Sequence, residues 1–412
     1  MADAQLMEKI VSLAKRRGFI FPGSEIYGGL AGTYDYGHLG LALKKNVENL
    51  WWSIFVEEHE NMYGVDAAIL MNPKVWEASG HVAGFSDPLA EGKSFNTMFK
   101  TSIGAGEEAL ATYLRPETAG GIFVNFKNTT DAYHPKLPFG IAQIGKAFRN
   151  EIAPRDFIFR LRELTQMEVE YFVRPGEWEQ AFEEWRMAMH AFAKAIGLPA
   201  DTFHELEVPE ADRAHYSKRT IDFEFDYPFG RKELWGLAYR GDFDLAAHET
   251  GSGVSLGYLD EENKEKIVPH VIEPSLGVDR TILAILVSSY REDELGGEGR
   301  TYLALAPKVA PVKAAVFPLL KNKPELVAKA REVYTMLKKE IPQIMWDDNG
   351  NIGKRYRRQD EIGTPFCITI DFDTLGESPD LADTVTLRHR DTGEQERIAI
   401  SELVGRIREA IR

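Results

Sequence analysis

The chain has 412 residues, 44% of them hydrophobic, so it is long enough for two or three domains with a buried core. Its net charge of -15 excludes a protein that coats nucleic acid over its whole surface, because an acidic surface repels the phosphate backbone. No apolar run approaches the roughly 18 residues of a membrane span, and the N-terminus lacks a signal-peptide core, so a cytoplasmic protein is expected.

The first part of the chain predicts two amphipathic helices on either side of a glycine-rich loop. Apolar side chains recur at helical spacing over Asp3–Arg17, with Asp3 as N-cap, and again over Leu39–Glu58. The stretch Gly28–Gly37 lacks the Lys-Ser/Thr pair and the Rossmann spacing of phosphate loops, so a packed loop is expected. After the second helix, Val65–Leu70 is predicted to be a strand that ends before Pro73.

A charged hairpin is predicted in the middle of the chain. Ile141–Phe148 and Phe159–Glu170 form its antiparallel arms around the turn residues Pro154-Arg155-Asp156. Strand alternation places a polar set on one face of the second arm: Gln166, Glu168 and Glu170. A solvated face with cross-strand ion pairs would explain a single Arg-Glu pair. The many arginines and carboxylates here suit a ligand that bears both phosphate and ammonium groups.

Further strands and helices complete an antiparallel sheet with helices packed on it. Glu177–Gly197 is predicted to be a helix with a core-facing aromatic side, and Val278–Tyr290 a second helix. The predicted strands between them are Thr220–Phe225, Glu233–Tyr239 and Pro269–Glu273.

The segment Gly296–Gly299 is predicted to be a linker. Beyond it, alternating elements predict an α/β domain of about a hundred residues. They are strand Ala314–Phe317, helix Pro324–Lys339, strand Gln343–Trp346, helix Ile352–Glu361, strands Phe366–Phe372 and Thr384–His389, and a terminal helix from Ser401. The single cysteine, Cys367, lies in an apolar strand and is expected to be a buried thiol. One cysteine excludes an internal disulfide and a zinc site built from several cysteines, so no zinc is expected.

Four stretches, in this order along the chain, resemble motifs of the class II aminoacyl-tRNA synthetases. They are Arg115-Pro116-Glu117-Thr118-Ala119, Phe148-Arg149-Asn150-Glu151 with its Arg-Glu-Leu return, Glu273–Arg280, and Arg355–Pro365. Within that class the chain is similar to the glycyl-tRNA synthetases of the homodimeric type, over nearly its whole length.

The resemblance implies an α+β fold in two parts. Residues 1–295 would form the class II catalytic domain, an antiparallel sheet flanked by helices, with motif 1 at about 39–73, motif 2 at about 141–172 and motif 3 at about 271–290. Residues 300–412 would form an α/β anticodon-binding domain. Motif 1 carries the subunit interface in this family, so a homodimer is implied, although the pattern alone equally fits an ordinary core helix.

The implied activity is the joining of glycine to tRNA(Gly), through glycyl-adenylate made from ATP with Mg2+. A synthetase for another amino acid and an inactive, class II-like accessory subunit that binds nucleic acid are the alternatives. The inactive form would lack the phosphate-binding arginines, and both Arg149 and Arg280 are present.

The resemblance also implies roles for residues that bind ATP. Arg149 would hold the α-phosphate, Glu151 would lie near the adenine amino group, Arg160 and Arg280 would reach the γ-phosphate, and Glu233 would hold Mg2+. Arg149, Glu151 and Arg280 are the implied catalytic residues. The implied ATP-binding set is Arg149, Asn150, Glu151, Phe159, Arg160, Leu161, Arg162, Glu163, Leu164, Glu233, Leu234, Gly277, Val278, Asp279 and Arg280.

The implied glycine site is acidic, because glycine offers an ammonium group and no side chain. Every competing amino acid is larger, so a filled pocket can reject it by steric clash without an editing domain. The implied set is Glu117, Leu164, Thr165, Gln166, Met167, Glu168, Glu273, Pro274, Ser275, Leu276 and Gly277. Leu164 departs from the family pattern, which often has a phenylalanine that stacks on adenine, and stacking is worth roughly 1–3 kcal/mol per base.

Two further features concern tRNA. A long insertion that the family often carries is missing here, because Pro88 is joined to Phe95 by six residues, Leu89–Ser94. A basic run in the second domain is the predicted tRNA contact, through Lys354, Arg355, Arg357 and Arg358. The alternative is that these arginines only form ion pairs, with Asp347, Asp348, Asp360 or Glu361.

Overall fold

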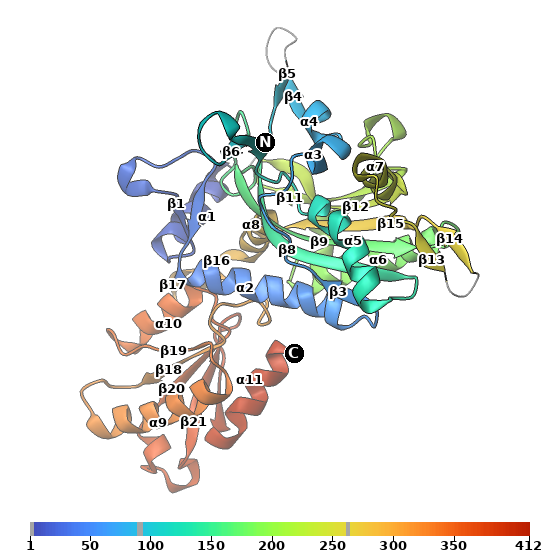
Figure 1. Cartoon of the computed structure of the whole chain (residues 1–412). Helices are drawn as coiled ribbons and strands as arrows, with labels where there is room; N and C mark the ends of the chain where they lie inside the picture. The colour runs from blue at the N-terminus through green and yellow to red at the C-terminus, as the bar shows by residue number, and fades with distance from the viewer. Residues whose placement is uncertain (1–3, 89–93, 261–263) are drawn as a thin grey trace.

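The computed structural model describes residues 4–88, 94–260 and 264–412. The predicted N-cap Asp3 and most of the short junction after Pro88 lie outside these residues. Figure 1 shows a large body built from the first three quarters of the chain and a smaller C-terminal part beneath it. None of the helices in the described ranges is long and apolar enough to span a bilayer.

The large body is organised around a seven-stranded sheet in the described part of the chain. All neighbouring strands are antiparallel except the last pair, β8 and β3. In spatial order the strands are β10 (Phe203–Glu207), β11 (Arg219–Tyr227), β12 (Gly230–Gly241), β15 (His270–Gly277), β9 (Glu163–Val173), β8 (Phe139–Phe148) and β3 (Met62–Gly64). The predicted antiparallel sheet is therefore confirmed, and so is the central hairpin, formed by β8 and β9.

One face of the sheet is covered by helices along its whole width (Figure 1). Met167 and Val169 of β9 point into this core, together with Leu276 of β15. The covering helices are α1 (Ala4–Arg16), α2 (His38–Trp52, continued by a π-helical turn at Ser53–Glu57), α6 (Trp178–Ala195) and α8 (Val278–Ser289).

The opposite face is covered only at one end. There α5 (Ala119–Tyr133) and α7 (Phe243–Ser252) pack against Phe139, Phe172 and Val271 of the sheet. The alternation of β9 places Glu168 and Glu170 on this same face, beside the small core. The rest of the face is left for a cavity.

The strand predicted at Val65–Leu70 is wrong. The strand that pairs with β8 is Met62–Gly64, and only the amide of Val65 continues the pairing, to the carbonyl of Ala142. Beyond it the carbonyl of Ala67 accepts a hydrogen bond of 2.7 Å from the Arg115 guanidinium. The Arg115 side chain thus takes the place of a neighbouring strand as hydrogen-bond donor to the Ala67 carbonyl, and the pairing with β8 ends before this residue.

Short elements connect these parts. They are β1 (Ile20–Pro22), β2 (Tyr34–Tyr36), α3 (Lys74–Ala78), α4 (His81–Gly84), β4 (Ser86–Pro88), β5 (Ser94–Asn96), β6 (Lys100–Ile103), β7 (Leu110–Tyr113), β13 (Tyr258–Asp260) and β14 (Glu265–Ile267). The loop predicted at Gly28–Gly37 is packed only in part: Arg162 donates from its amide to Gly32 and from its guanidinium to Ala31, but residues 28–31 are exposed.

The predicted linker Gly296–Gly299 is part of a β-hairpin. β16 (Tyr290–Leu295) and β17 (Glu298–Leu303) pair around Gly296 and Gly297, whose φ angles of 65° and 79° are those of a tight hairpin turn. After β17, Leu305, Val309 and Val312 still pack into the core of the large body. That body therefore continues to Val312.

The C-terminal part is the predicted α/β domain. Its five described strands have the order β19 (Ile344–Trp346), β18 (Ala314–Pro318), β20 (Phe366–Ile370), β21 (Thr384–His389) and β22 (Gln395–Ala399), with helices α9 (Pro324–Glu340), α10 (Ile352–Glu361) and α11 (Leu403–Ile411). Strand β22 was not predicted, because it begins with three polar residues and none of its side chains is fully buried. Cys367 is buried in β20, as predicted.

The basic run on α10 is largely used inside the fold. Arg355 is 1% exposed and donates to the carbonyls of Pro318, Asp348 and Gly350, so it offers no surface to RNA. Arg358 forms a bidentate ion pair with Asp347, with distances of 2.8 Å and 3.0 Å. The prediction of a tRNA contact is wrong for Arg355, and Arg358 follows the ion-pair alternative.

Candidate active site

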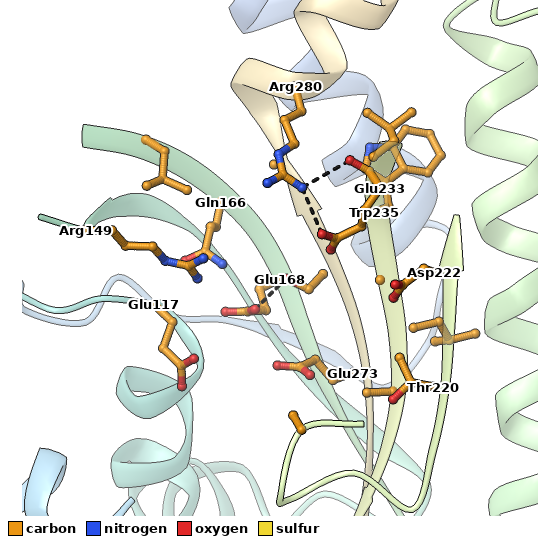
Figure 2. A pocket seen from close by; sticks show the side chains of 18 of the residues that line it. Glu117, Arg149, Gln166, Glu168, Thr220, Asp222, Glu233, Trp235, Glu273 and Arg280 are labelled. Carbon is orange, nitrogen blue, oxygen red and sulfur yellow. Dashed lines mark hydrogen bonds and ion pairs between the residues drawn. The ribbon is translucent and has the colours of Figure 1, made fainter. Parts of the chain in front are cut away.

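A cavity of about 340 Å³ occupies the uncovered part of the sheet (Figure 2). Its floor is made by β9, β15, β12 and β11, and the chain around the central hairpin closes one side. It brings together sixteen of the residues expected at the site: Glu117, Arg149, Glu151, Phe159, Arg160, Leu161, Leu164, Gln166, Glu168, Glu233, Leu234, Glu273, Ser275, Gly277, Asp279 and Arg280.

The other expected residues do not line this cavity: Asn150, Arg162, Glu163, Thr165, Met167, Pro274, Leu276 and Val278. Strand alternation explains most of them, because every second side chain of β9 and β15 faces the helices. Met167 and Leu276 are fully buried in that core. Thr165 receives a hydrogen bond from Lys44 and donates its amide to Asp279, so it supports the strand from behind.

Three carboxylates gather at one end of the cavity, which we call the acidic end: Glu117, Glu168 and Glu273 (Figure 2). Glu168 is 2% exposed and accepts hydrogen bonds from the hydroxyls of Thr118 and Ser275, the second at 2.7 Å. The Gln166 amide oxygen beside them is buried and has no hydrogen-bond partner among the described residues. Such a set of oxygen atoms is suited to a small cation that donates several hydrogen bonds.

Glu273 is held by a buried arginine that the sequence did not single out. Arg240, at the end of β12, is 1% exposed and donates to Glu273 at 2.8 Å. It also forms a bidentate pair with Asp244 of α7, both distances being 2.7 Å. The close spacing of Arg240 and Asp244 at a strand-to-helix junction is the only sequence signal of this group.

Glu117 stays ionised although it is enclosed. Burial alone would raise the pKa of its carboxyl, but the charge and hydrogen bond of His81, with the charges of Arg240 and Arg149, lower that pKa to about 2. The His81 Nε2 atom lies 3.3 Å from the Glu117 carboxylate, and its Nδ1 lies 2.8 Å from the Ser79 hydroxyl. Glu117 therefore presents a full negative charge to the cavity.

Glu170 lies behind the acidic end, outside the cavity wall. It is fully buried, and neither of its oxygens has a hydrogen-bond partner among the described residues. Oxygens of Glu168, Glu170 and Glu273 come within 4.8 Å of one another. Burial, followed by the charge of Glu273, raises the pKa of Glu170 well above its usual range. Burial also raises the pKa of Glu273, to about 8, but Glu273 has Arg240 as a partner and Glu170 has none in the described part of the chain, so Glu170 holds its proton more tightly.

The opposite part of the cavity is the arginine end, formed by Arg149, Arg160 and Arg280. Arg280, in the first turn of α8, lies over the Phe159 ring at 4.4 Å and donates to the Glu233 carboxylate at 3.1 Å (Figure 2). Arg160 donates to Glu151 at 2.6 Å. These side chains are only partly buried, so their charges are accessible to a polyanion.

Arg149 has a different environment from the other two arginines. Its Nε donates to the Pro116 carbonyl at 3.0 Å, and its guanidinium lies 5.5 Å from the Phe85 ring. No carboxylate partner of Arg149 occurs among the described residues, so its outer nitrogens keep their donors for a ligand. An adjoining outer cavity of about 520 Å³ shares Arg149 and adds Arg155 and Lys232, which extends the positive wall outward.

A second acid accompanies Glu233. Asp222 of β11 lines the same cavity, and burial, together with the charges of Glu233 and Glu224, raises its pKa to about 6. Carboxylate oxygens are the ligands that Mg2+ prefers in proteins. Glu233 and Asp222 therefore fit a magnesium ion carried by a phosphate ligand, and Asp222 was not predicted from the sequence.

Comparisons with known proteins agree with this architecture. Residues 99–289 match the family model described as the tRNA synthetase class II core domain (G, H, P, S and T), and residues 313–410 match the anticodon binding domain. The second match begins where the core of the large body ends.

Curated relatives match the chain over nearly its whole length. A glycine–tRNA ligase of Clostridium tetani is 48% identical, covering 100% of both chains. Those of Lachnospira eligens and Chlorobaculum tepidum are 48% and 44% identical, covering 96% of this chain and 97% and 98% of their own. The first alignment extends over 470 positions, whereas this chain has 412 residues, so that relative has residues without a counterpart here.

Proposed function

The chain belongs to the glycine–tRNA ligase family of class II aminoacyl-tRNA synthetases, and we propose that it activates glycine with ATP and transfers it to the 3′ end of tRNA(Gly). One observation carries the proposal. A single cavity joins a buried acidic end to an arginine end, as a ligand with an ammonium group at one end and phosphates at the other requires.

Glycine would bind at the acidic end through its ammonium group. Glu117 and Glu168 supply negative charge, and the free Gln166 oxygen can accept a further hydrogen bond. A buried charge is stable only when it is paired and hydrogen-bonded. The ammonium group of glycine would pair with the carboxylates and donate hydrogen bonds to them. This direction of binding leaves the glycine carboxylate facing the arginine end.

ATP would bind at the arginine end. In the proposed geometry Arg149 holds the α-phosphate, since its outer nitrogens have no carboxylate partner, while Arg160 and Arg280 exchange Glu151 and Glu233 for phosphate oxygens. Leu164 and Phe159 are the apolar side chains beside the arginines on the wall and would contact the adenine ring. Mg2+ bound to ATP neutralises phosphate charge, and Glu233 with Asp222 would hold it.

The chemistry needs no protein nucleophile. The glycine carboxylate attacks the α-phosphorus, diphosphate leaves, and the terminal ribose hydroxyl of tRNA later attacks the glycyl carbonyl and displaces AMP. The protein contributes position, and it stabilises the charge that develops on the α-phosphate, chiefly through Arg149.

Transfer to tRNA, dimer formation and location belong to the same proposal. The C-terminal α/β domain would contact the tRNA anticodon, with Lys354 and Arg357 of α10 as residual candidates for contact. α2 would lie at a homodimer interface, and an enzyme that charges tRNA would work in the cytoplasm. The match of residues 313–410 to the anticodon binding domain supports the proposed tRNA contact.

Amino-acid-dependent exchange of pyrophosphate into ATP, run with each of the twenty amino acids, tests the proposal. We expect exchange with glycine and Mg2+, and charging of tRNA(Gly) by the full chain. A chain cut after Val312 should keep the exchange but charge tRNA poorly, because the core of the large body ends there. Exchange that depends on another amino acid, or no exchange at all, would contradict the proposal.

A further inference from the structure

The loop between β10 and β11, residues Val208–Lys218, closes over the cavity beside the acidic end. It contributes Val208, Ala214 and Tyr216 to the cavity wall. Asp212 and Arg213 of the loop also line the cavity, and Tyr216 is the largest side chain that the loop contributes. None of its residues was expected at the site from the sequence.

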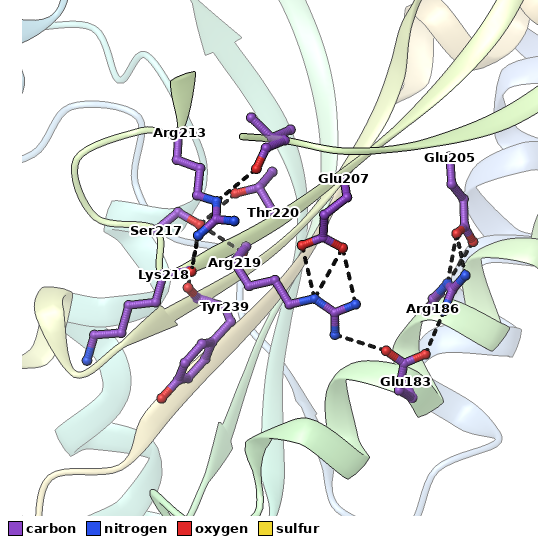
Figure 3. Close-up of polar contacts among 11 residues, drawn as sticks. Glu183, Arg186, Glu205, Glu207, Arg213, Ser217, Lys218, Arg219, Thr220 and Tyr239 are labelled. Carbon is purple, nitrogen blue, oxygen red and sulfur yellow. Dashed lines mark hydrogen bonds and ion pairs between the residues drawn. The ribbon is translucent and has the colours of Figure 1, made fainter. Parts of the chain in front are cut away.

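Hydrogen bonds fasten the two ends of the loop to each other and to the sheet (Figure 3). The Arg213 guanidinium donates to the carbonyl of Val208 at 2.9 Å and to that of Lys218 at 2.5 Å. The Ser217 hydroxyl donates to the Arg219 carbonyl at 2.8 Å. A loop tied at its base in this way holds its side chains in fixed positions.

Tyr216 is the large side chain that this loop directs toward the acidic end. Its ring lies over the buried Arg240 guanidinium at 3.7 Å, the same group that holds Glu273. Burial and the charges of Glu273 and Glu117 raise the pKa of its hydroxyl. The ring therefore lies within the electrostatic reach of two carboxylates of the acidic end, fixed by a cation–π contact.

We propose that Tyr216 is a specificity-determining residue, whose ring fills the space that the side chain of any amino acid larger than glycine would need. The inference rests on the proposed function, because it concerns the amino acid bound at the acidic end. Hydrogen bonds at the base of the loop and the cation–π contact with Arg240 hold the ring in place, so a larger amino acid could enter only by displacing these contacts. Rejection of alanine and serine then follows from clash instead of from a lost hydrogen bond.

The test is pyrophosphate exchange by the full chain with glycine, alanine and serine, comparing the parent with Tyr216→Ala and Tyr216→Phe. The ratio of kcat/KM for glycine over alanine should fall at least about tenfold in Tyr216→Ala and should be kept in Tyr216→Phe, because only the first removes the ring. The KM for ATP should not change in either variant.

Glu210→Ala is the matched control, since Glu210 is an exposed residue of the same loop and lies outside the cavity wall. It should keep the parent ratio. If Tyr216→Ala does not fold, Tyr216→Leu removes the ring but keeps an apolar side chain over Arg240. The same fall in the glycine-over-alanine ratio is expected.

A folded Tyr216→Ala or Tyr216→Leu protein with the parent ratio would overturn the inference, and so would an equal fall in Glu210→Ala. Both outcomes leave the proposed function intact. Absence of glycine-dependent exchange in the parent would instead contradict the proposed function itself, so the two failures are distinguishable.

Discussion

At the acidic end of the cavity each carboxylate that faces a ligand rests on fixed, buried partners, whereas at the arginine end the charged side chains pair with one another and stay partly exposed. Glu168 has Thr118 and Ser275, and Glu273 has Arg240. Arg280 and Arg160, in contrast, are held by Glu233 and Glu151, groups that a phosphate would replace. The acidic end is thus built before its ligand arrives, and the arginine end rearranges when its ligand arrives.

The largest expected effect is at Arg149, the arginine without a carboxylate partner. Arg149→Ala should lower glycine-dependent exchange by at least about a hundredfold, because it removes a donor to the charge that develops on the α-phosphate. Exchange kinetics and thermal melting of the variant give the measurement. The control Arg231→Ala removes an exposed arginine of β12 that pairs with Asp226, and it should leave exchange unchanged. Near-normal exchange in folded Arg149→Ala protein would contradict the role of the arginine end.

The next effect separates the two ends. Glu168→Gln should raise the KM for glycine by about tenfold to a hundredfold and leave the KM for ATP unchanged, because a hydrogen bond to a charged group contributes about 1.5–3 kcal/mol. Glu163→Gln, on the same strand but exposed and paired with Lys146, should change neither constant. Equal losses for glycine and ATP in Glu168→Gln would show that Glu168 supports the sheet and not a ligand.

A smaller effect is expected from loosening the arginine end. Glu233→Gln should raise the Mg2+ concentration needed for half-maximal exchange by several-fold, on the order of 1 kcal/mol, while the KM for glycine stays constant. Glu207→Gln is the matched control, because Glu207 lies on β10 of the same sheet, outside the cavity wall, and pairs with Arg219. An unchanged Mg2+ requirement in Glu233→Gln would remove Glu233 from the metal site.

The last effect is on stability instead of exchange, and it concerns the proton on Glu170. Because its pKa is raised in the folded state, the folded protein binds a proton that the unfolded chain has lost above its ordinary carboxyl pKa. Stability is therefore lost as pH rises from that value toward the folded pKa, by at most about 1.4 kcal/mol per pH unit. Glu170→Gln carries no such proton, so its Tm relative to the parent should increase between pH 6 and pH 9. A pH-independent difference would show that Glu170 is ionised.

Sequence alone predicted the elements of the cavity floor well, because strand alternation and helix periodicity are local signals. The period of two on β9 correctly put Gln166 and Glu168 on one face and Met167 on the other. The resemblance instead implied runs of consecutive residues on β9 and β15. Strand alternation turns every second residue of such a run away from the cavity wall, as at Thr165 and Leu276.

The partners of the acidic end could not be predicted, because they come from distant segments. Arg240 reaches Glu273 from the neighbouring strand, 33 residues earlier in the chain, and His81 reaches Glu117 from a short helix. Neither pairing has a fixed sequence spacing. Tyr216 was missed for the same reason, since only the closure of its loop places it beside Arg240.

The basic run on α10 shows the opposite error. Five adjacent residues with four positive charges suggested a surface for RNA, but a helix turns by about 100° per residue and cannot present them on one side. Arg355 faces inward and Arg358 is paired with Asp347. Charge clustered in sequence therefore did not become charge clustered in space.

The central claim is that one ligand spans both ends of the cavity and that the acidic end admits only glycine. Calorimetric titration of the full chain with the sulfamoyl analogues of glycyl-adenylate and alanyl-adenylate tests it most directly, because neither analogue reacts. We predict that the glycyl analogue binds more tightly than either glycine or ATP, and at least about a hundredfold more tightly than the alanyl analogue. Equal binding of the two analogues, or binding of the glycyl analogue no tighter than that of ATP, would contradict the account.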